Sequence, residues 1–506
     1  MSGHGPDGAL GGGAAHDPPD AGDWFVRPAD RLIAVQLPVA LALIFLIALP
    51  VPGLVSVLDG ASLGLMVMLA SLPIWYAAAR ARNTPFDPVA TRAVSVVLAS
   101  AGFLIFWSLL SILGADEPMR ASRYIATLSA AFAIYFLVRS TVTRARIALY
   151  VDVLAVGLAA TAAVSLLAYQ VDGLRDIIFK GTDRAAGFFK NPNQFGMAIS
   201  TTIPAVMALV LAERQRRPLR AVCLILMLLG LVASGSKTNF LLVWASIFAV
   251  VCCRAWIFHT GRKRVGLLVL SLFGSLVFAA LGVVALTFLN PRALTIMLEF
   301  FNGDGEVDSL LTRSYLWSYS IDQFLADPVF GQGAGQRIDI FYREADVSHS
   351  HNVLLDYMRT LGAPGLLAVS VMIGAVVIVC LLSIGKALRS SNVAPGPRLI
   401  CLGLSLNCLS YVAANMSSDS FGPSTSPFFW IFAYLAFASR SLMSPRPSVG
   451  HLRQSAEPTI SSRFPLLVGQ AAIENASGSA MKFTTLKLGI WLILTVAAMA
   501  VAIAVL

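Results

Sequence analysis

Long apolar runs separated by short polar clusters dominate this chain. An α-helix needs about 20 mostly apolar residues to cross the hydrocarbon core of a bilayer, and runs of this kind predict about 12 to 13 transmembrane helices. The predicted spans cover residues 32–55, 62–79, 89–113, 122–138, 147–170, 193–212, 219–234, 238–258, 265–289, 353–384, 398–415, 427–440 and 485–505. The pattern therefore predicts an all-α polytopic integral membrane protein.

Composition supports this class. Hydrophobic residues make up 57 % of the chain and charged residues only 13 %, whereas soluble domains carry about 25 % charged residues. This excludes a soluble globular protein, an extended disordered chain and a nucleic-acid-binding domain as descriptions of the whole. All six cysteines fall inside predicted spans, which indicates buried thiols and no disulfide framework.

The positions of lysine and arginine predict the orientation, because these residues concentrate in cytoplasmic loops. Alternate loops are basic, and they contain Arg80, Arg82 and Arg92; Arg139, Arg144 and Arg146; Arg214, Arg216, Arg217 and Arg220; Arg262, Lys263 and Arg264; Lys386, Arg389 and Arg398; and Arg440, Arg446 and Arg453. These loops and the N-terminus are expected inside. The intervening loops are then outside, and most of the net charge of +10 reflects topology.

The chain divides into spans and a few longer polar segments. The expected divisions are a disordered cytoplasmic tail at 1–31, spans at 32–289, a large outer loop at 290–352, further spans at 353–440, a cytoplasmic linker at 441–484 and an extra C-terminal transmembrane helix at 485–506. Loops this long are usually functional or disordered. Within the outer loop, apolar residues recur at helical spacing over 309–328 and Pro328 ends the run, so the loop is expected to be partly helical.

The positions of the histidines suggest the first candidate catalytic residue. Of six histidines, only His349 and His351 lie outside and next to the start of a span. Asn352 is a suitable N-cap for that span. His351 would then lie at the positive end of a helix dipole, which favours a neutral imidazole able to accept a proton.

The same two histidines could bind a metal ion only with help from other residues. A His-x-His pair needs at least one more ligand, and Asp346 or Asp356 is near in sequence. No other residues have the spacing of metal ligands. We therefore predict no metal site.

Arginine and lysine on the outer side run against the positive-inside trend and favour an anionic ligand there. Arg184 opens the segment RAAGFFKNPNQ, which leads directly into a span, and Arg313 precedes most of the predicted loop helix. The planar guanidinium makes paired hydrogen bonds with phosphate. The further outer cations considered for substrate binding are Lys190, Lys237, Arg337 and Arg343.

Three segments together resemble the O-antigen ligase family. His351-Asn352, nine further residues and Gly362-Ala-Pro-Gly365 match its H-N-x9-G-x-x-G pattern, and the glycines offer a thin helix surface for close packing. TRSYLWSYSIDQFLADPVFGQGAG resembles the stretch that precedes it, and RAAGFFKNPNQ resembles an earlier outer loop in the same order. The motifs cover about 180–370, and the topology covers the whole chain, although the span at 485–505 exceeds the usual twelve.

The resemblance implies a glycosyltransferase in the bacterial inner membrane with a periplasmic active face. The donor would be an undecaprenyl-diphosphate-linked glycan, and the acceptor would be a glycan or lipid A-core. Transfer would invert the anomeric centre with no metal or nucleotide cofactor. His351 would act as the base, while Arg184 and Arg313 hold the diphosphate. No nucleic-acid partner is expected.

Other functions fit the same residues in part. A transporter or flippase of lipid-linked anionic saccharides would use the outer arginines for binding without reaction. A non-catalytic scaffold of a polysaccharide assembly complex would not need His351. Within the family, ligase and polymerase remain open, as do the sugar, its linkage and the oligomeric state.

Overall fold

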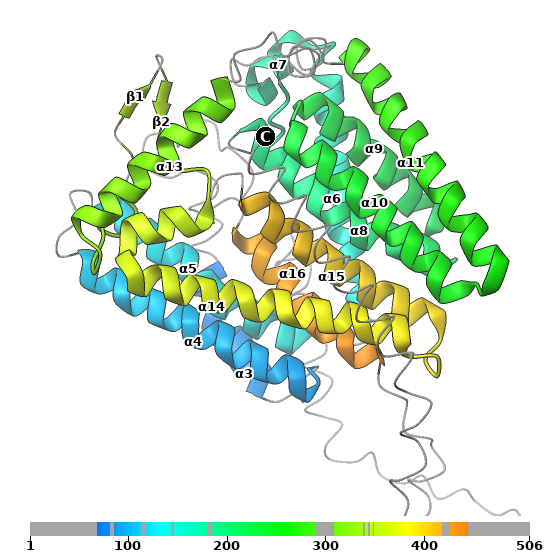
Figure 1. Ribbon diagram of the computed structural model, residues 1–506, viewed down its shortest axis with the longest axis horizontal. Coiled ribbons are helices and arrows are strands. Elements are labelled where there is room, and N and C mark those ends of the chain that lie inside the picture. Colours follow the sequence, from blue (N-terminus) through cyan, green and yellow to red (C-terminus); the bar gives the residue numbers. More distant parts are fainter. Residues whose placement is uncertain are drawn as a thin grey trace, which may run out of the picture.

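The computed structural model shows a bundle of helices (Figure 1). It describes residues 68–80, 86–112, 118–142, 146–179, 184–189, 191–289, 308–336, 338, 340–342, 345–347, 349–416 and 426–443. The predicted spans at 32–55 and 485–505, the tail at 1–31 and nearly all of the linker at 441–484 lie outside these residues.

The helices of the described part follow the predicted spans closely. They are α3 (Leu72–Arg80), α4 (Pro88–Ser111), α5 (Pro118–Thr141), α6 (Ile147–Leu167), α7 (Asp172–Phe179), α8 (Pro192–Ala212), α9 (Arg217–Ser234), α10 (Lys237–Phe258), α11 (Gly261–Leu289), α13 (Asp308–Ala326), α14 (Val353–Arg389), α15 (Pro395–Asn415) and α16 (Ser426–Ser439), followed by the 3-10 turn η2 (Arg440–Met443). Eight of the described helices are long and apolar enough to cross a membrane. The predicted all-α polytopic fold is confirmed.

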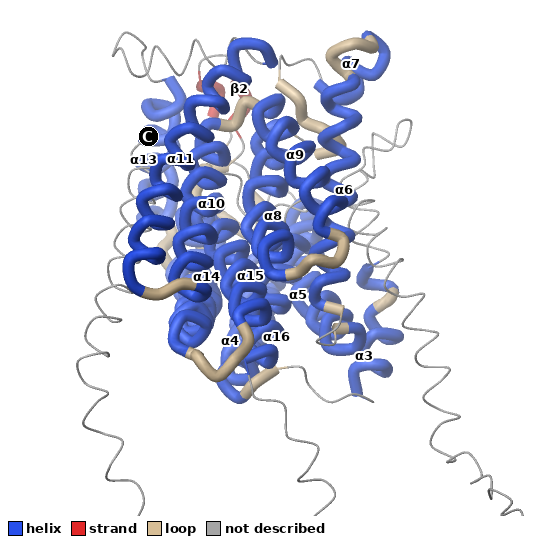
Figure 2. Tube along the Cα trace, turned by 90° about the vertical axis from the view of Figure 1, so that its right-hand side faces the viewer, coloured by secondary structure: helices blue, strands red, loops and turns tan. Residues whose placement is uncertain are grey.

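The long loop adds two features at one end of the bundle (Figure 2). The predicted loop helix is confirmed as α13. Beyond it, β1 (Ile340–Tyr342) and β2 (Ala345–Val347) form a short antiparallel hairpin. The hairpin and α7 were not expected from the sequence, because segments of three to eight residues give too short a pattern to recognise.

The core lies where α8, α15 and α16 meet their neighbours. Every residue of α16 is buried, as expected for a helix that is apolar all round. Helix α8 packs against α6, α9, α10 and α15. Gly403 of α15 allows this approach, since a Cβ atom there would meet Ala208 and lie 2.9 Å from the carbonyl oxygen of Pro204. All six cysteines are free thiols.

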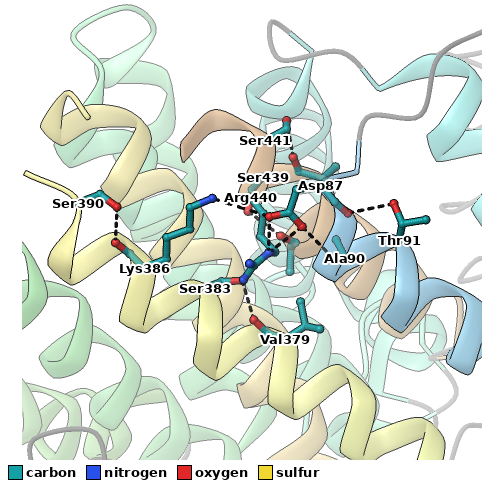
Figure 3. Close-up of polar contacts among 12 residues, drawn as sticks. Asp87, Ala90, Thr91, Val379, Ser383, Lys386, Ser390, Ser439, Arg440 and Ser441 are labelled. Carbon is teal, nitrogen blue, oxygen red and sulfur yellow. Dashed lines mark hydrogen bonds and ion pairs between the residues drawn. The ribbon is translucent and has the colours of Figure 1, made fainter. Parts of the chain in front are cut away.

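The opposite end of the bundle is held by an ion-pair cluster (Figure 3). Asp87 caps α4 by accepting from the backbone N–H of Ala90 at 2.8 Å. Its carboxylate also accepts from Arg440 Nε at 3.0 Å and lies 3.8 Å from Lys386 Nζ. Arg440 Nη1 donates to Ser383 Oγ at 3.0 Å. The start of α4 and the ends of α14 and α16 therefore lie together, in agreement with the alternation of basic loops.

Candidate active site

The turn before α14 holds His351 in an unusual backbone conformation. His351 has φ of 55°, in the left-handed region that non-glycine residues rarely adopt. The next residue is the predicted cap: Asn352 Oδ1 accepts from the backbone N–H groups of Leu354 at 3.0 Å and Leu355 at 3.3 Å. Asn352 Nδ2 donates to the carbonyl of Met416, beyond the end of α15, at 3.3 Å. The capping prediction is confirmed, and it places His351 at the N-terminal end of α14.

Ser350, the residue before His351, stabilises this turn through hydrogen bonds. Its backbone N–H donates to Asp356 Oδ1 at 2.9 Å, and its hydroxyl donates to the same oxygen at 2.7 Å. The Ser350 hydroxyl is also 3.0 Å from the carbonyl oxygen of Asn352. The rings of His349 and His351 meet edge to face, with centroids 4.4 Å apart. Within the described residues, no group of three or more His, Cys, Asp or Glu side chains is arranged to hold a metal ion.

Helix α13 docks against this turn and brings Arg313 with it. Trp317 Nε1 donates to the carbonyl of Ser350 at 2.9 Å. Arg313 lies four residues earlier, on the same face of the helix one turn away. Burial lowers the pKa of Arg313, but a guanidinium starts so far above neutrality that it stays charged. Arg313 is therefore a partly desolvated cation on the helix that contacts the His351 turn.

Helix α14 is interrupted at Gly362, further along the helix from the His351 turn. Gly362 has φ of 65° and ψ of −161°, a combination open essentially to glycine alone. The carbonyls freed near the break are satisfied from outside the helix: Gln332 N–H donates to Arg359 at 2.9 Å, and Gly333 N–H donates to Thr360 at 3.1 Å. Trp107 Nε1 donates to Leu361 at 3.0 Å.

The glycine-rich segment after α13 is the partner of this break. Gly331, Gly333 and Gly335 all have positive φ, so the backbone turns tightly here. A Cβ atom on Gly362 would collide with the backbone of Pro328 and Val329. The sequence predicts close packing at Gly362, and this is correct, but the helix is not continuous there and its partner is loop backbone.

Arg184 forms a second polar centre, where α8 begins and α9 ends. Its Nε donates to the carbonyl of Ser234 at 2.8 Å, and its Nη2 donates to Asn193 Oδ1 at 2.7 Å. Asn239 Nδ2 in turn donates to the Asn193 carbonyl at 3.2 Å. Burial lowers the pKa of Arg184. These hydrogen-bond partners are neutral, so they orient the guanidinium without cancelling its charge.

The predicted site residues that the structure describes fall at one end of the bundle. His351 and the helix of Arg313 meet through Ser350. Arg184 contacts Asn193 in the first turn of α8. Helix α8 packs against α15, and Met416, just beyond the end of α15, accepts from Asn352. Lys237 is exposed at the first position of α10. Lys190, Arg337 and Arg343 lie outside the described residues.

Three polar residues were not identified as part of this site from sequence. The sequence indicates Asp356 only as a possible metal ligand, whereas in the structure its carboxylate accepts from Ser350. Asn193 and Asn239 orient Arg184 and its surroundings. A sequence signal for them was available, since all three are polar residues at the ends of apolar spans, where polar side chains are rare and often functional.

Comparison with known proteins agrees with the resemblance. Residues 222–370 match the family model described as O-Antigen ligase. The match includes Arg313, the glycine-rich turn, His351 and the break at Gly362, whereas Arg184 precedes it. The comparison with curated proteins gave no match. Residues 222–370 are thus similar to the O-antigen ligase family, in agreement with the motifs found in the sequence.

Proposed function

We propose that the protein transfers a glycan from an undecaprenyl-diphosphate carrier to an acceptor sugar hydroxyl on the periplasmic face of the bacterial inner membrane. The acceptor is lipid A-core in a ligase or a growing glycan in a polymerase. In this orientation the end of the bundle that carries α13 faces the periplasm, and the Asp87–Arg440 end faces the cytoplasm.

Such a transfer requires few catalytic groups. The leaving lipid diphosphate is already a stable anion, so its departure needs no general acid. The acceptor hydroxyl must lose a proton as it attacks the anomeric carbon, and the departing charge must be stabilised. One base and a pair of cations are sufficient, and a single displacement inverts the anomeric centre.

The observation that carries the proposal is the conformation of His351. A left-handed backbone at a non-glycine residue costs about 1–3 kcal/mol and persists where the surroundings enforce it, often at functional sites. Here Ser350 and Asn352 fix the chain on both sides of His351. We assign His351 as the base that accepts the acceptor proton.

The two arginines suit the diphosphate. Arg313 and Arg184 are both partly withdrawn from water, and burial lowers the pKa of each. A desolvated cation gains more from an arriving anion than one in bulk water, because the local dielectric is lower. We assign these two residues to the diphosphate, with Lys190, Lys237, Arg337 and Arg343 as additional contacts to the donor.

A deletion strain tests the proposal and separates its two branches. Lipopolysaccharide gels are read beside an exopolysaccharide assay, with the wild-type gene returned as a control. Lipid A-core without O-antigen, with long glycan left on its carrier, indicates a ligase. Core capped by a single repeat, or missing exopolysaccharide, indicates a polymerase. Normal lipopolysaccharide and exopolysaccharide in the deletion strain would overturn the proposal.

A further inference from the structure

Asp356 is a buried acid close to His351, and the proposed chemistry does not use it. The residue is 7 % exposed. A carboxylate withdrawn from water is costly unless hydrogen bonds and local charge compensate it. Asp356 lies in the first turn of α14, where the helix dipole favours an anion. Both hydrogen bonds from Ser350 reach its Oδ1 atom.

These hydrogen bonds close a short loop of backbone that contains His351. Ser350 is held from Asp356, six residues further along, and its hydroxyl also lies 3.0 Å from the Asn352 carbonyl. The backbone is therefore held both at the residue before His351 and at the residue after it. Because a left-handed conformation is unfavourable for histidine, the backbone would relax if this loop opened, and the imidazole would move with it.

Ser350 also connects this loop to α13. Its carbonyl accepts from Trp317 Nε1 at 2.9 Å, and Arg313 lies one helical turn before Trp317. Ser350 thus donates to Asp356, adjoins His351 in the chain and contacts α13, the helix that carries Arg313. Releasing Ser350 from Asp356 would disturb both His351 and the spacing of Arg313 from it.

We propose that Asp356 is a positioning residue for the transfer reaction: through its two hydrogen bonds with Ser350, it holds His351 in the left-handed conformation and fixes α13 against the His351 turn. This inference rests on the proposed role of His351. It differs from that role because Asp356 acts through Ser350 and takes no proton from the acceptor.

Kinetics of the purified protein in proteoliposomes test the proposal, with a synthetic polyprenyl-diphosphate-linked saccharide as donor. Asp356→Ala removes the acceptor and is expected to lower kcat about 100-fold, the usual effect of a misplacement near 1 Å. The KM for the donor should change less, because the arginines remain. Asp356→Asn keeps an oxygen for Ser350, and it should restore kcat to within about 3-fold of wild type if hydrogen bonding is the cause.

Two matched pairs separate positioning from general stability. Ser350→Ala is compared with Ser405→Ala, since Ser405 is a buried serine in α15 whose hydroxyl donates to Cys401. Trp317→Phe is compared with Trp244→Phe, since Trp244 also donates to a serine carbonyl, that of Ser275, at 2.9 Å. Only Ser350→Ala and Trp317→Phe should lower kcat, while thermal unfolding shifts similarly within each pair.

The outcomes are distinct. If Asp356→Ala transfers at the wild-type rate while His351→Ala is inactive, the positioning role is wrong and the proposed function stands. If Asp356→Asn is as slow as Asp356→Ala, the charge matters and the hydrogen-bond mechanism is overturned. If wild type itself transfers no glycan, the proposed function fails. If wild type transfers and His351→Ala is equally active, the assignment of His351 as the base fails, and the positioning role of Asp356 fails with it. Should Asp356→Ala not insert into the membrane, the Asp356→Asn and Trp317→Phe kinetics decide the question.

Discussion

The guanidinium of Arg184 bridges two helix ends: Nη2 donates to Asn193 Oδ1 at 2.7 Å, and Nε donates to the Ser234 carbonyl at 2.8 Å. One partner lies in the first turn of α8, and the other is the last residue of α9. This geometry needs a planar group with donors in a fixed fork. It fixes the position of a partly desolvated cation at the proposed donor site.

Lysine should not replace Arg184. A single ammonium group cannot keep the Asn193 and Ser234 bonds and also form a paired contact with a phosphate. We expect Arg184→Lys to lower kcat/KM for the donor about 100-fold, the size of effect seen when one charge-stabilising donor is lost. Arg175→Lys is the matched control, because Arg175 is an exposed cation of α7 in the same loop region. Equal activity of both variants would contradict the assignment.

Arg313 is expected to act mainly on donor binding. Arg313→Ala should raise the KM for the lipid-diphosphate donor at least about 10-fold, which corresponds to about 1.4 kcal/mol of lost binding free energy. Ser318→Ala removes an exposed hydroxyl from the same helix, α13, and should leave the KM unchanged. The measurement is initial-rate transfer at varied donor concentration. An unchanged KM in Arg313→Ala would remove this residue from the donor site.

The break at Gly362 should tolerate no side chain. A Cβ atom there meets the backbone of Pro328 and Val329, and the φ and ψ values are unfavourable for alanine. Gly362→Ala should therefore destabilise the protein by about 2–3 kcal/mol or more. Gly374→Ala lies in the same helix, where a Cβ atom would have no neighbour within 4 Å. Thermal unfolding in detergent should show a lower Tm for the first variant only.

The Asp87–Arg440 pair should contribute strongly to stability. The two side chains are 11 % and 6 % exposed, so removing one leaves the other charged and nearly buried. Breaking a buried pair in this way costs about 3–5 kcal/mol. Arg440→Ala should lower the Tm clearly. Arg389→Ala removes one positive charge from the same end of the bundle, where Arg389 is exposed, and should have little effect. Similar Tm values for the two variants would show that the pair adds no stability.

The fold was predictable wherever one local signal decides the structure. Apolar length located the spans, Asn352 was recognised as a cap from its type and position, and apolar spacing located α13. These signals act within a few residues of the chain. They can therefore be recognised in the sequence without knowledge of the tertiary structure.

The site was predictable only in part because its decisive contacts are distant in sequence. The break at Gly362 depends on the backbone of Pro328 and Val329, and no spacing rule reveals a pairing between a loop and a helix. The Ser234 carbonyl that orients Arg184 lies 50 residues away. Asp356 was missed for a different reason: its position near two histidines in the sequence led to its being considered only as a third metal ligand, whereas in the structure it accepts from Ser350, the serine between them.

Transfer by purified protein tests the central assignment most directly. Wild type and His351→Ala are reconstituted with a polyprenyl-diphosphate-linked saccharide and an acceptor glycan, in the presence of EDTA, and product and released lipid diphosphate are measured together. We predict that wild type transfers despite the chelator. His351→Ala, inserted and folded to the same extent, should be slower by about 100-fold or more, as expected when a general base is lost. Transfer by His351→Ala at the wild-type rate would contradict the account.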